Sequence, residues 1–468
     1  MKTRVRLAPS PTGFMHIGNA QSALYNWLFA RKKNGAFLLR IEDTDKERST
    51  KEFEQNILDS LKWLSIEPDE PPVIQSRNLL RHTEVLEKLL SGGQAFYCYH
   101  TKEELEAERN DQEANKQAPR HVCEYKSQPT GQRVDANPPV AGQVQDGVIR
   151  LRVNENSNRV ISFEDQIRGK IEFKESLLGD FAIARQVDDP LYHFAVVVDD
   201  MDMNISHIIR GEDHISNTPK QILIYEAIQK IQTKPSAIPV FAHLPLILAS
   251  DRSKLSKRHG GTSIIEYQKD YLPETMTNFL GSLSYTFSKE IISKEEMAKE
   301  FELEKVHKSG AVFDIKKLNW INSRYLKNVG INKLRNLTGI DGIPEEALSL
   351  ITERLEKLSD IQNFSFFWKE PAYKPELLKW RKASLEESLG ALEKVKVVIE
   401  KNEWDTQLIR SNLDKLGEEL GDRGLVYWPF RVALTGLEKS PDPVDVASIL
   451  TKNKVLDRIS KAFLTDGN

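Results

Sequence analysis

The segment that most constrains the fold lies at the start of the chain, where strand and helix patterns alternate. Residues 6–19 predict a short strand, a turn made by prolines and glycine, and the start of a helix. Apolar residues then recur at helical spacing up to residue 33, and residues 36–41 are typical of a buried parallel strand. Another helix pattern begins at residue 51. This order predicts a βαβ unit, and with it an α/β fold on a Rossmann-like, doubly wound parallel sheet.

His16 and Gly18 stand at the predicted start of the first helix. A helix N-terminus presents backbone N–H groups and the positive end of its dipole, which suits a phosphate or a carboxylate. Glu42 follows the second strand, and the carboxyl ends of parallel strands face the crevice where such sheets bind ligands. The alternative for His16 is a histidine satisfied by its own turn, and the turn alone leaves both interpretations open.

The composition is that of an ordinary globular protein. The 468 residues, 39% of them hydrophobic, allow about three domains. The net charge is only −3, so a nucleic-acid partner would need local basic surface. Two cysteines favour a reducing compartment. The N-terminus lacks the apolar core of a signal peptide, and no apolar run reaches the roughly 18 residues of a membrane helix. We therefore expect a cytoplasmic protein without a membrane partner.

The α/β pattern is interrupted over residues 91–190. A polar tract covers residues 101–116, and a stretch rich in Pro, Gly, Asn and Gln covers residues 128–147. Short β-like segments follow at residues 148–153 and 159–163. The simplest interpretation is an inserted α+β domain within the nucleotide-binding fold.

Cys98, His100 and Cys123 are candidate metal ligands within this insertion. Thiolate and imidazole are the donors that zinc selects, and two paired clusters could close a loop around an ion. The fourth ligand would have to be Tyr125 or His121, which is a poorer set than one with more cysteines. Two reduced thiols packed in a small subdomain explain the residues equally well, so the sequence does not decide whether zinc is bound.

The α/β pattern resumes at residue 189. Residues 190–200 are an apolar run that contains Tyr192 and ends in acids, and we interpret this run as a strand. Residues 205–209 predict a further strand, which ends at Arg210. Further on, residues 251–261 form a loop with five basic residues and two glycines; by itself it is a solvated charged loop as readily as a functional one.

The last third of the chain is dominated by helix patterns and contains few β-like runs, which predicts an all-α helix bundle. These patterns cover residues 344–358, 384–400, 406–420 and 444–464. Before them, residues 314–335 carry six basic residues against one acid, with Trp320 and Tyr325 interleaved. Such a stripe suits a polyphosphate backbone, although a solvated helical face would look similar.

Three blocks together resemble those of the bacterial-type glutamyl-tRNA synthetases, a family of class I aminoacyl-tRNA synthetases. They are APSPTGFMHIGN at residues 8–19, RIEDTD at residues 40–45 and KLSKR at residues 254–258. In this family the first motif usually reads HIGH or HIGG, whereas this chain has Asn19 in the fourth place. The last block resembles the family's mobile KMSKS-type loop. WPFRVALTG at residues 428–436 matches the family's C-terminal pattern, so the resemblance covers nearly the full chain.

The resemblance implies a division of the chain into five parts. They are a first half of the catalytic Rossmann domain at 1–95, an inserted acceptor-binding domain at 96–188, a second catalytic half at 189–242, a stem-contact region with the KLSKR loop at 243–325, and a helical anticodon-binding region at 326–468.

The resemblance also implies site residues. Those expected to be catalytic are His16, Gly18, Lys254 and Lys257. Those expected to bind ATP are the same four with Asn19, Leu255 and Ser256. Those expected to bind glutamate are Arg6, Ala8, Ser10, Glu42, Tyr192 and Arg210.

Within the glutamate set, Arg6 and Tyr192 would contact the side-chain carboxylate, Glu42 the ammonium and Arg210 the α-carboxylate. An arginine fork can bind both oxygens of a carboxylate. The alternative for both arginines is an ion pair with a neighbouring acid, such as Glu42, Glu212 or Asp213. His193 stands beside Tyr192 where relatives often have Asn, and its role is open.

The implied activity is ATP-dependent attachment of L-glutamate to tRNA(Glu) through glutamyl-adenylate, with release of AMP and pyrophosphate. ATP with Mg²⁺, L-glutamate and tRNA(Glu) are the expected partners of a monomer. One alternative is a synthetase that also charges tRNA(Gln), or is dedicated to it. The other, from a different class, is an inactive tRNA-binding paralogue, against which the presence of His16, Gly18, Lys254 and Lys257 argues.

Overall fold

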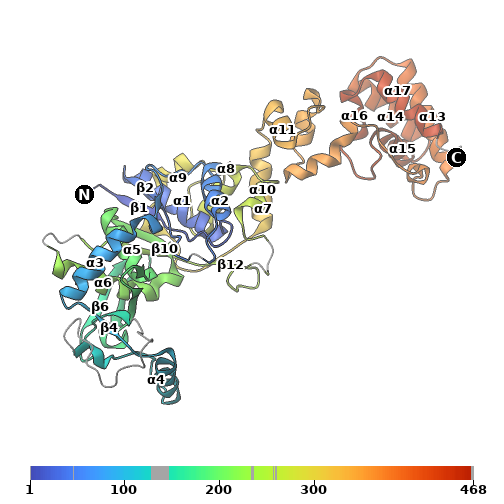
Figure 1. Cartoon of the computed structure of the whole chain (residues 1–468). Coiled ribbons are helices and arrows are strands. Elements are labelled where there is room, and N and C mark those ends of the chain that lie inside the picture. Colours follow the sequence, from blue (N-terminus) through green and yellow to red (C-terminus); the bar gives the residue numbers. More distant parts are fainter. Residues whose placement is uncertain are drawn as a thin grey trace. The chain divides into compact units, whose positions relative to one another are not determined.

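The computed structural model describes residues 2–45, 47–127, 147–232, 237–256, 258 and 261–464. The contacts divide the chain into two units (Figure 1). One comprises Met1–Gln268 with Met276–Asp314, and the other comprises Lys269–Thr275 with Ile315–Asn468. Among the described residues, none of the helices combines the length and the apolar character needed to cross a bilayer.

The predicted βαβ unit is confirmed. Strand β1 (Arg4–Leu7) and strand β2 (Ala36–Ile41) pair in parallel, and helix α1 (Ile17–Lys32) connects them. Every residue of β2 is buried, which explains why the strand is apolar apart from Arg40. Helix α2 (Lys51–Trp63) leads on to β3 (Val73–Ile74), which pairs in parallel with β2.

A second sheet continues the α/β architecture. Its strand order is β10 (His207–Gly211), β11 (Val240–Leu244), β6 (Val160–Asp165) and β7 (Gly169–Lys174). The first three strands are parallel, and helix α6 (Thr218–Ile231) joins β10 to β11. The backbone N–H of Ser206 donates to the Arg4 carbonyl at 2.9 Å, which ties the start of β10 to β1. The carboxyl ends of β1 and β10 thus lie beside each other.

The prediction of a strand over residues 190–200 is wrong. They belong to helix α5 (Tyr192–Asp202). All residues from Phe194 to Asp200 are buried, so the helix shows no polar face, and an apolar run of this length does not separate a buried helix from a buried strand. The helical period matters for the site, because it brings Asp199 and Asp200 into the interior.

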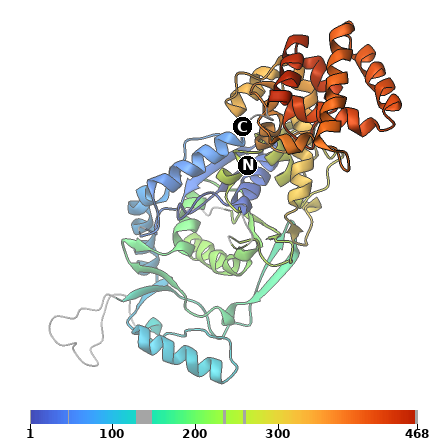
Figure 2. The ribbon, with the colours of Figure 1, turned by 90° about the vertical axis from the view of Figure 1, so that its right-hand side faces the viewer.

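The interruption contains an antiparallel sheet with strand order β4 (Ala95–Cys98), β5 (Val148–Leu151), β8 (Ala182–Gln186) and β9 (Asp189–Pro190). Helix α3 (Leu79–Ser91) precedes β4. The polar tract forms α4 (Lys102–Ala114), which Thr101 and Glu104 begin with a capping box. None of its residues is buried, and it lies at the edge of this unit (Figures 1 and 2). Most of the Pro- and Gly-rich stretch, residues 128–146, lies outside the described residues.

The elements that follow β11 up to residue 314 are short. They are β12 (Ile247–Leu248), α7 (Ile264–Tyr267), α8 (Pro273–Leu283), α9 (Lys294–Glu300) and β13 (Ala311–Val312). The first unit contains all of them except the first residues of α8, which belong to the second unit.

Among its described residues the second unit contains helices and no strands, as predicted, and Figure 2 shows its helices in orange and red. Its α-helices are α10 (Ile315–Leu326), α11 (Ile331–Thr338), α12 (Leu348–Thr352), α13 (Leu385–Lys401), α14 (Thr406–Glu419), α15 (Arg423–Thr435), α16 (Pro443–Ile449) and α17 (Lys452–Leu464). Leu392, Phe430 and Ile459 are among the fully buried residues of its core. The single helix expected over residues 444–464 is two, because the chain turns extended at Leu450.

Candidate active site

His16 caps the N-terminus of α1. Its backbone is extended, and its Nδ1 accepts a hydrogen bond from the backbone N–H of Gly18 at 3.0 Å. A ring nitrogen that accepts a backbone N–H cannot itself carry the proton, so neutral His16 holds its proton on Nε2 and donates from there.

Two distant segments meet at His16. His16 and Ser263 form an antiparallel bridge, and the N–H of Ile17 donates to the Thr262 carbonyl at 2.8 Å. The segment that directly follows the basic loop is therefore fixed beside the start of α1. The sequence predicted the two motifs, and the structure shows the backbone pairing that brings them together.

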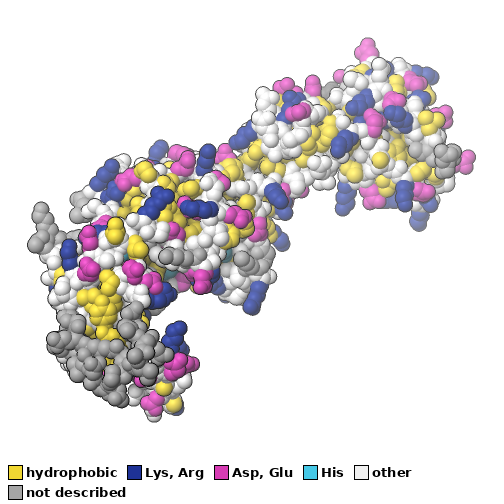
Figure 3. All heavy atoms as spheres, viewed as in Figure 1, with side chains coloured by type: hydrophobic (Ala, Val, Ile, Leu, Met, Phe, Trp, Pro, Cys, Tyr) yellow, Lys and Arg dark blue, Asp and Glu magenta, His cyan; other side chains and the backbone are white. Residues whose placement is uncertain are grey.

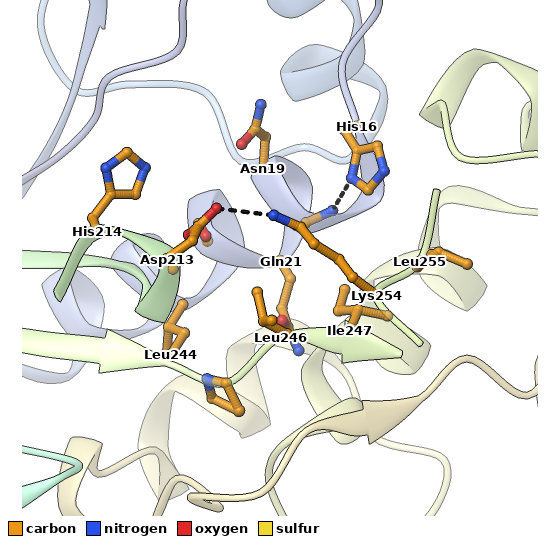
Figure 4. Close-up of a pocket in the computed structure, with 14 residues that line it drawn as sticks. His16, Asn19, Gln21, Asp213, His214, Leu244, Leu246, Ile247, Lys254 and Leu255 are labelled. Carbon is orange, nitrogen blue, oxygen red and sulfur yellow. Dashed lines mark hydrogen bonds and ion pairs between the residues drawn. The ribbon is translucent and has the colours of Figure 1, made fainter. Parts of the chain in front are cut away.

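A cavity of about 310 Å³ opens between His16 and the start of the basic loop (Figure 4). The Lys254 side chain extends toward Asp213, and its Nζ lies 3.1 Å from Asp213 Oδ2. This pair is about half exposed, so it is weak and can be exchanged for another anion. The lining residues include His16, Gly18, Asn19, Lys254 and Leu255. Ser256 does not line this cavity, and Lys257 lies outside the described residues.

A smaller cavity of about 80 Å³ adjoins the first, and the two share Asn19, Ser22, Gly211 and His214. Five of the six residues expected to bind glutamate line it: Arg6, Ala8, Glu42, Tyr192 and Arg210. They come from β1, the turn after it, the end of β2, α5 and β10, which are far apart in sequence. The sixth, Ser10, is exposed and lines neither cavity, so its assignment stays a prediction.

A buried network of charges lies behind this cavity. Asp200 accepts from Arg6 Nε at 3.0 Å and from Arg40 Nη1 at 2.6 Å, and Arg40 Nη2 donates to Glu42 at 3.0 Å. All four side chains are at most 5% exposed. Burial raises the pKa of Glu42 despite the attraction of Arg40, whereas the two arginines outweigh burial and lower the pKa of Asp200.

Sequence reasoning missed Arg40 and Asp200. Arg6 was expected to pair, if with any acid, with Glu42, Glu212 or Asp213, and its partner is Asp200 instead. The available signal was the pair of acids that closes the apolar run Val196–Val198, because a buried charge needs a partner.

Arg210 differs from Arg6 and Arg40, because the partners of its guanidinium are neutral. Its Nε donates to His243 Nε2 at 3.2 Å, and its Nη2 donates to Thr218 Oγ1 at 2.8 Å. Its Nη1 is buried and has no hydrogen-bonding partner in the described part of the chain. Burial lowers the pKa of Arg210 to about 10, which leaves the group charged at neutral pH. The small cavity therefore contains a buried cation without a paired anion, which is an arrangement that favours an anionic ligand.

Tyr192 and His193 begin α5 and point differently. The Tyr192 hydroxyl lies 3.3 Å from His214 Nδ1, beside the small cavity. His193 lines neither cavity, and its buried Nδ1 has no hydrogen-bonding partner among the described residues. Burial lowers the pKa of His193, and likewise that of His214, to about 4, so both rings are neutral at pH 7.

The cysteine and histidine residues of the insertion come together as one cluster. Ligand atoms of Cys98, His100, His121 and Cys123 all lie within 4.8 Å of one another. Cys98 Sγ is 3.4 Å from His100 Nδ1 and 3.6 Å from His121 Nε2, and Cys123 Sγ is 3.7 Å from His100 Nδ1. Atoms bound to one zinc at about 2.0–2.3 Å in a tetrahedron have such separations. Of the two candidates for the fourth position, His121 fits, whereas Tyr125 packs its ring against His100, with centroids 5.1 Å apart.

Comparisons with known proteins match both units. Residues 2–320 match the family described as tRNA synthetases class I (E and Q), catalytic domain, and residues 296–463 match the anticodon binding domain. The chain is 39% identical to glutamate–tRNA ligase 2 of Thermoanaerobacter pseudethanolicus, covering 99% of this chain and 98% of that protein. It is 41% identical to glutamate–tRNA ligase 2 of Caldanaerobacter subterraneus, covering 98% of each.

The crystal structure of a glutamate tRNA ligase from Elizabethkingia meningosepticum has a similar fold. It matches with a TM-score of 0.83 and 30% identity, over 99% of this chain and all of that one.

Proposed function

The chain belongs to the class I aminoacyl-tRNA synthetases, in the branch of the glutamate and glutamine enzymes, and we propose that it attaches L-glutamate to tRNA(Glu). Glutamate first attacks the α-phosphorus of ATP, which gives glutamyl-adenylate and pyrophosphate. The terminal ribose of the tRNA then takes the acyl group and AMP leaves. The observation that carries the proposal is the unpaired buried Nη1 of Arg210 in a small cavity that adjoins the His16 cavity.

The small cavity supplies a partner for each charged group of glutamate. Arg210 would bind the α-carboxylate through Nη1, and Arg6 with Tyr192 would bind the side-chain carboxylate. Glu42 lies 4% exposed at the same cavity and would accept from the ammonium. Arg40 and Asp200 do not line this cavity and hold Glu42 and Arg6 in place. A neutral glutamine amide would leave an arginine poorly paired, which favours glutamate.

The larger cavity would bind ATP. His16 would donate from Nε2 to the phosphate oxygens as charge grows on them, and Gly18 would let the nucleotide lie close to the backbone. Lys254 would leave Asp213 for the leaving pyrophosphate, helped by Lys257 as the sequence predicts. Mg²⁺ would arrive with ATP and be held largely by phosphates and water. Because the two cavities share residues, the carboxylate and the α-phosphorus would meet between them.

The Cys₂His₂ cluster would hold a zinc ion. Its donor types and separations fit, and four protein ligands leave no open coordination position, so the ion would stabilise the insertion and take no part in the reaction. The acceptor end of tRNA would lie on the insertion, its stem on residues 243–325, and its anticodon on the helices of residues 326–468. We further propose a monomeric enzyme of the cytoplasm.

Pyrophosphate exchange with purified protein, glutamate and tRNA(Glu) tests the activity. tRNA is included because this family generally needs it to activate the amino acid. ATP–pyrophosphate exchange that depends on glutamate is expected, and its absence would favour the inactive paralogue. Charging of tRNA(Glu) and tRNA(Gln) transcripts side by side then separates a discriminating enzyme from one that charges both.

A further inference from the structure

A chain of buried polar groups stands behind Arg210. His243 Nε2 accepts from Arg210 Nε at 3.2 Å, and His243 Nδ1 lies 2.6 Å from Asp165 Oδ2. The side chains of His243 and Asp165 are fully buried. Asp165 is itself fixed, because its Oδ1 accepts from the backbone N–H of Ile167 at 3.0 Å and of Arg168 at 2.8 Å.

The direction of each hydrogen bond in this chain is determined. Arginine Nε can only donate, so His243 Nε2 must accept and cannot carry a proton. The proton of neutral His243 is therefore on Nδ1, from which it is donated to Asp165. A carboxylate at this place selects the tautomer that arginine requires. Protonation of His243 would place an N–H against the guanidinium. Burial lowers the pKa of His243, and the charges of Arg210 and Arg168 lower it further, which outweighs the opposite effect of Asp165.

This arrangement fixes the position of the third guanidinium nitrogen of Arg210, Nη1. The guanidinium is planar, so hydrogen bonds from Nε to His243 and from Nη2 to Thr218 fix its plane and orientation. The remaining group, Nη1, is buried and unpartnered within the described residues, and Arg210 lines the small cavity. A long side chain held in this way loses little further conformational entropy when an anion binds.

We propose that His243 and Asp165 are positioning residues that orient Arg210 toward the α-carboxylate of glutamate, which deepens and rests on the function proposed above. The three residues lie on neighbouring strands in the order β10, β11, β6. Arg210 and His243 are paired in register, and Asp165 is the residue of β6 that pairs with β11. Asp165 belongs to the part of the chain that interrupts the α/β pattern, so this segment directly supports the glutamate site.

The test compares substitutions that remove different parts of the chain of hydrogen bonds. His243→Phe removes the side-chain hydrogen bonds of His243 with Arg210, Asp165 and Thr218. Asp165→Asn offers an amide N–H to His243 Nδ1 and so favours the wrong tautomer. His243→Gln retains an acceptor for Arg210. His207→Gln, on the same strand as Arg210 but at its other end, is the matched control. The measurement is tRNA-dependent pyrophosphate exchange over a range of glutamate and ATP concentrations, with the melting temperature of each variant.

The KM for glutamate should rise about tenfold to a hundredfold in His243→Phe and Asp165→Asn, the usual range when a hydrogen bond to a charged group is removed. The KM for ATP should change less than about twofold, and His243→Gln should restore much of the affinity for glutamate. Equal rises of both constants, or a KM for glutamate unchanged in His243→Phe and Asp165→Asn, would overturn the inference alone. If the wild-type protein shows no glutamate-dependent exchange, the proposed function fails and the inference fails with it.

Discussion

At the scale of single residues, the hydrogen bond between His16 and Gly18 has a definite consequence for the reaction. It assigns the proton of neutral His16 to Nε2. His16→Ala should lower the rate of glutamate activation by about 10²-fold, because it removes a donor to charge that develops in the transition state. Pyrophosphate exchange at saturating substrates measures this rate.

His16→Gln is the informative companion, since an amide N–H can replace part of the Nε2–H donation. Its activity should lie between those of the wild type and the alanine variant. Equal activity of the alanine variant and the wild type would contradict a role for His16 at the phosphates.

The neutral histidines near the small cavity predict a pH dependence of stability. His193 and His214 each have a pKa of about 4 in the fold, against about 6.5 in an unfolded chain. Between these values the unfolded state binds more protons, so the stability that neutral rings provide is present above pH 6.5 and is lost as the pH falls toward 4. The melting temperature of the wild type should therefore fall between pH 7 and pH 5.

His193→Asn removes one titrating ring that lines neither cavity. Its melting temperature should fall less than that of the wild type over the same pH range. An equal or larger fall would mean that His193 does not contribute to the pH dependence.

At the scale of elements, the position of α4 depends on few contacts with the rest of its unit. None of its residues is buried, and the Glu108 carboxylate lies 2.6 Å from Nδ1 of His121, whose Nε2 faces Cys98. A carboxylate behind a ligand histidine orients the ring and raises its basicity. Glu108→Gln should lower zinc affinity by about tenfold to a hundredfold, measured by competition with a chelator.

The exposed Glu106 of the same helix provides the matched control. Glu106→Gln should leave zinc affinity unchanged, and removal of zinc should increase amide hydrogen exchange in α4. If both substitutions lower the affinity equally, Glu108 has no specific effect on His121. If the wild type binds no zinc, the zinc site itself is wrong.

The sequence predicted elements well where their pattern has one meaning. The βαβ unit could be predicted because β2 is buried on both faces and α1 starts at a recognisable turn. Helix α5 could not be predicted, because its apolar run fits either a buried helix or a buried strand. The site residues came from motifs, whereas the partners Asp200, His243 and Asp165 lie up to 194 residues from the groups that they contact, and no local pattern encodes such a pairing.

At the scale of the whole molecule, the net charge is too small to attract a nucleic acid, so such binding needs local basic surface. The net charge is −3, and both signs are interspersed over the face shown in Figure 3. Binding of a tRNA backbone would therefore depend on particular basic segments rather than on the field of the whole protein. We propose helix α10 as such a segment, since exposed Lys316 and Lys317 follow one another in its first turn.

Removal of these charges should weaken tRNA binding through its electrostatic part. Lys316→Ala with Lys317→Ala should raise the dissociation constant for tRNA and reduce the slope of log K against log salt by about one for each phosphate that is no longer neutralised. Lys62→Ala, an exposed lysine of α2, serves as the control for a change of charge elsewhere. Filter binding between about 50 and 200 mM salt measures the slope. A dissociation constant that rises without a change of slope would mean that α10 acts through its fold, and unchanged binding would leave it as a solvated helical face.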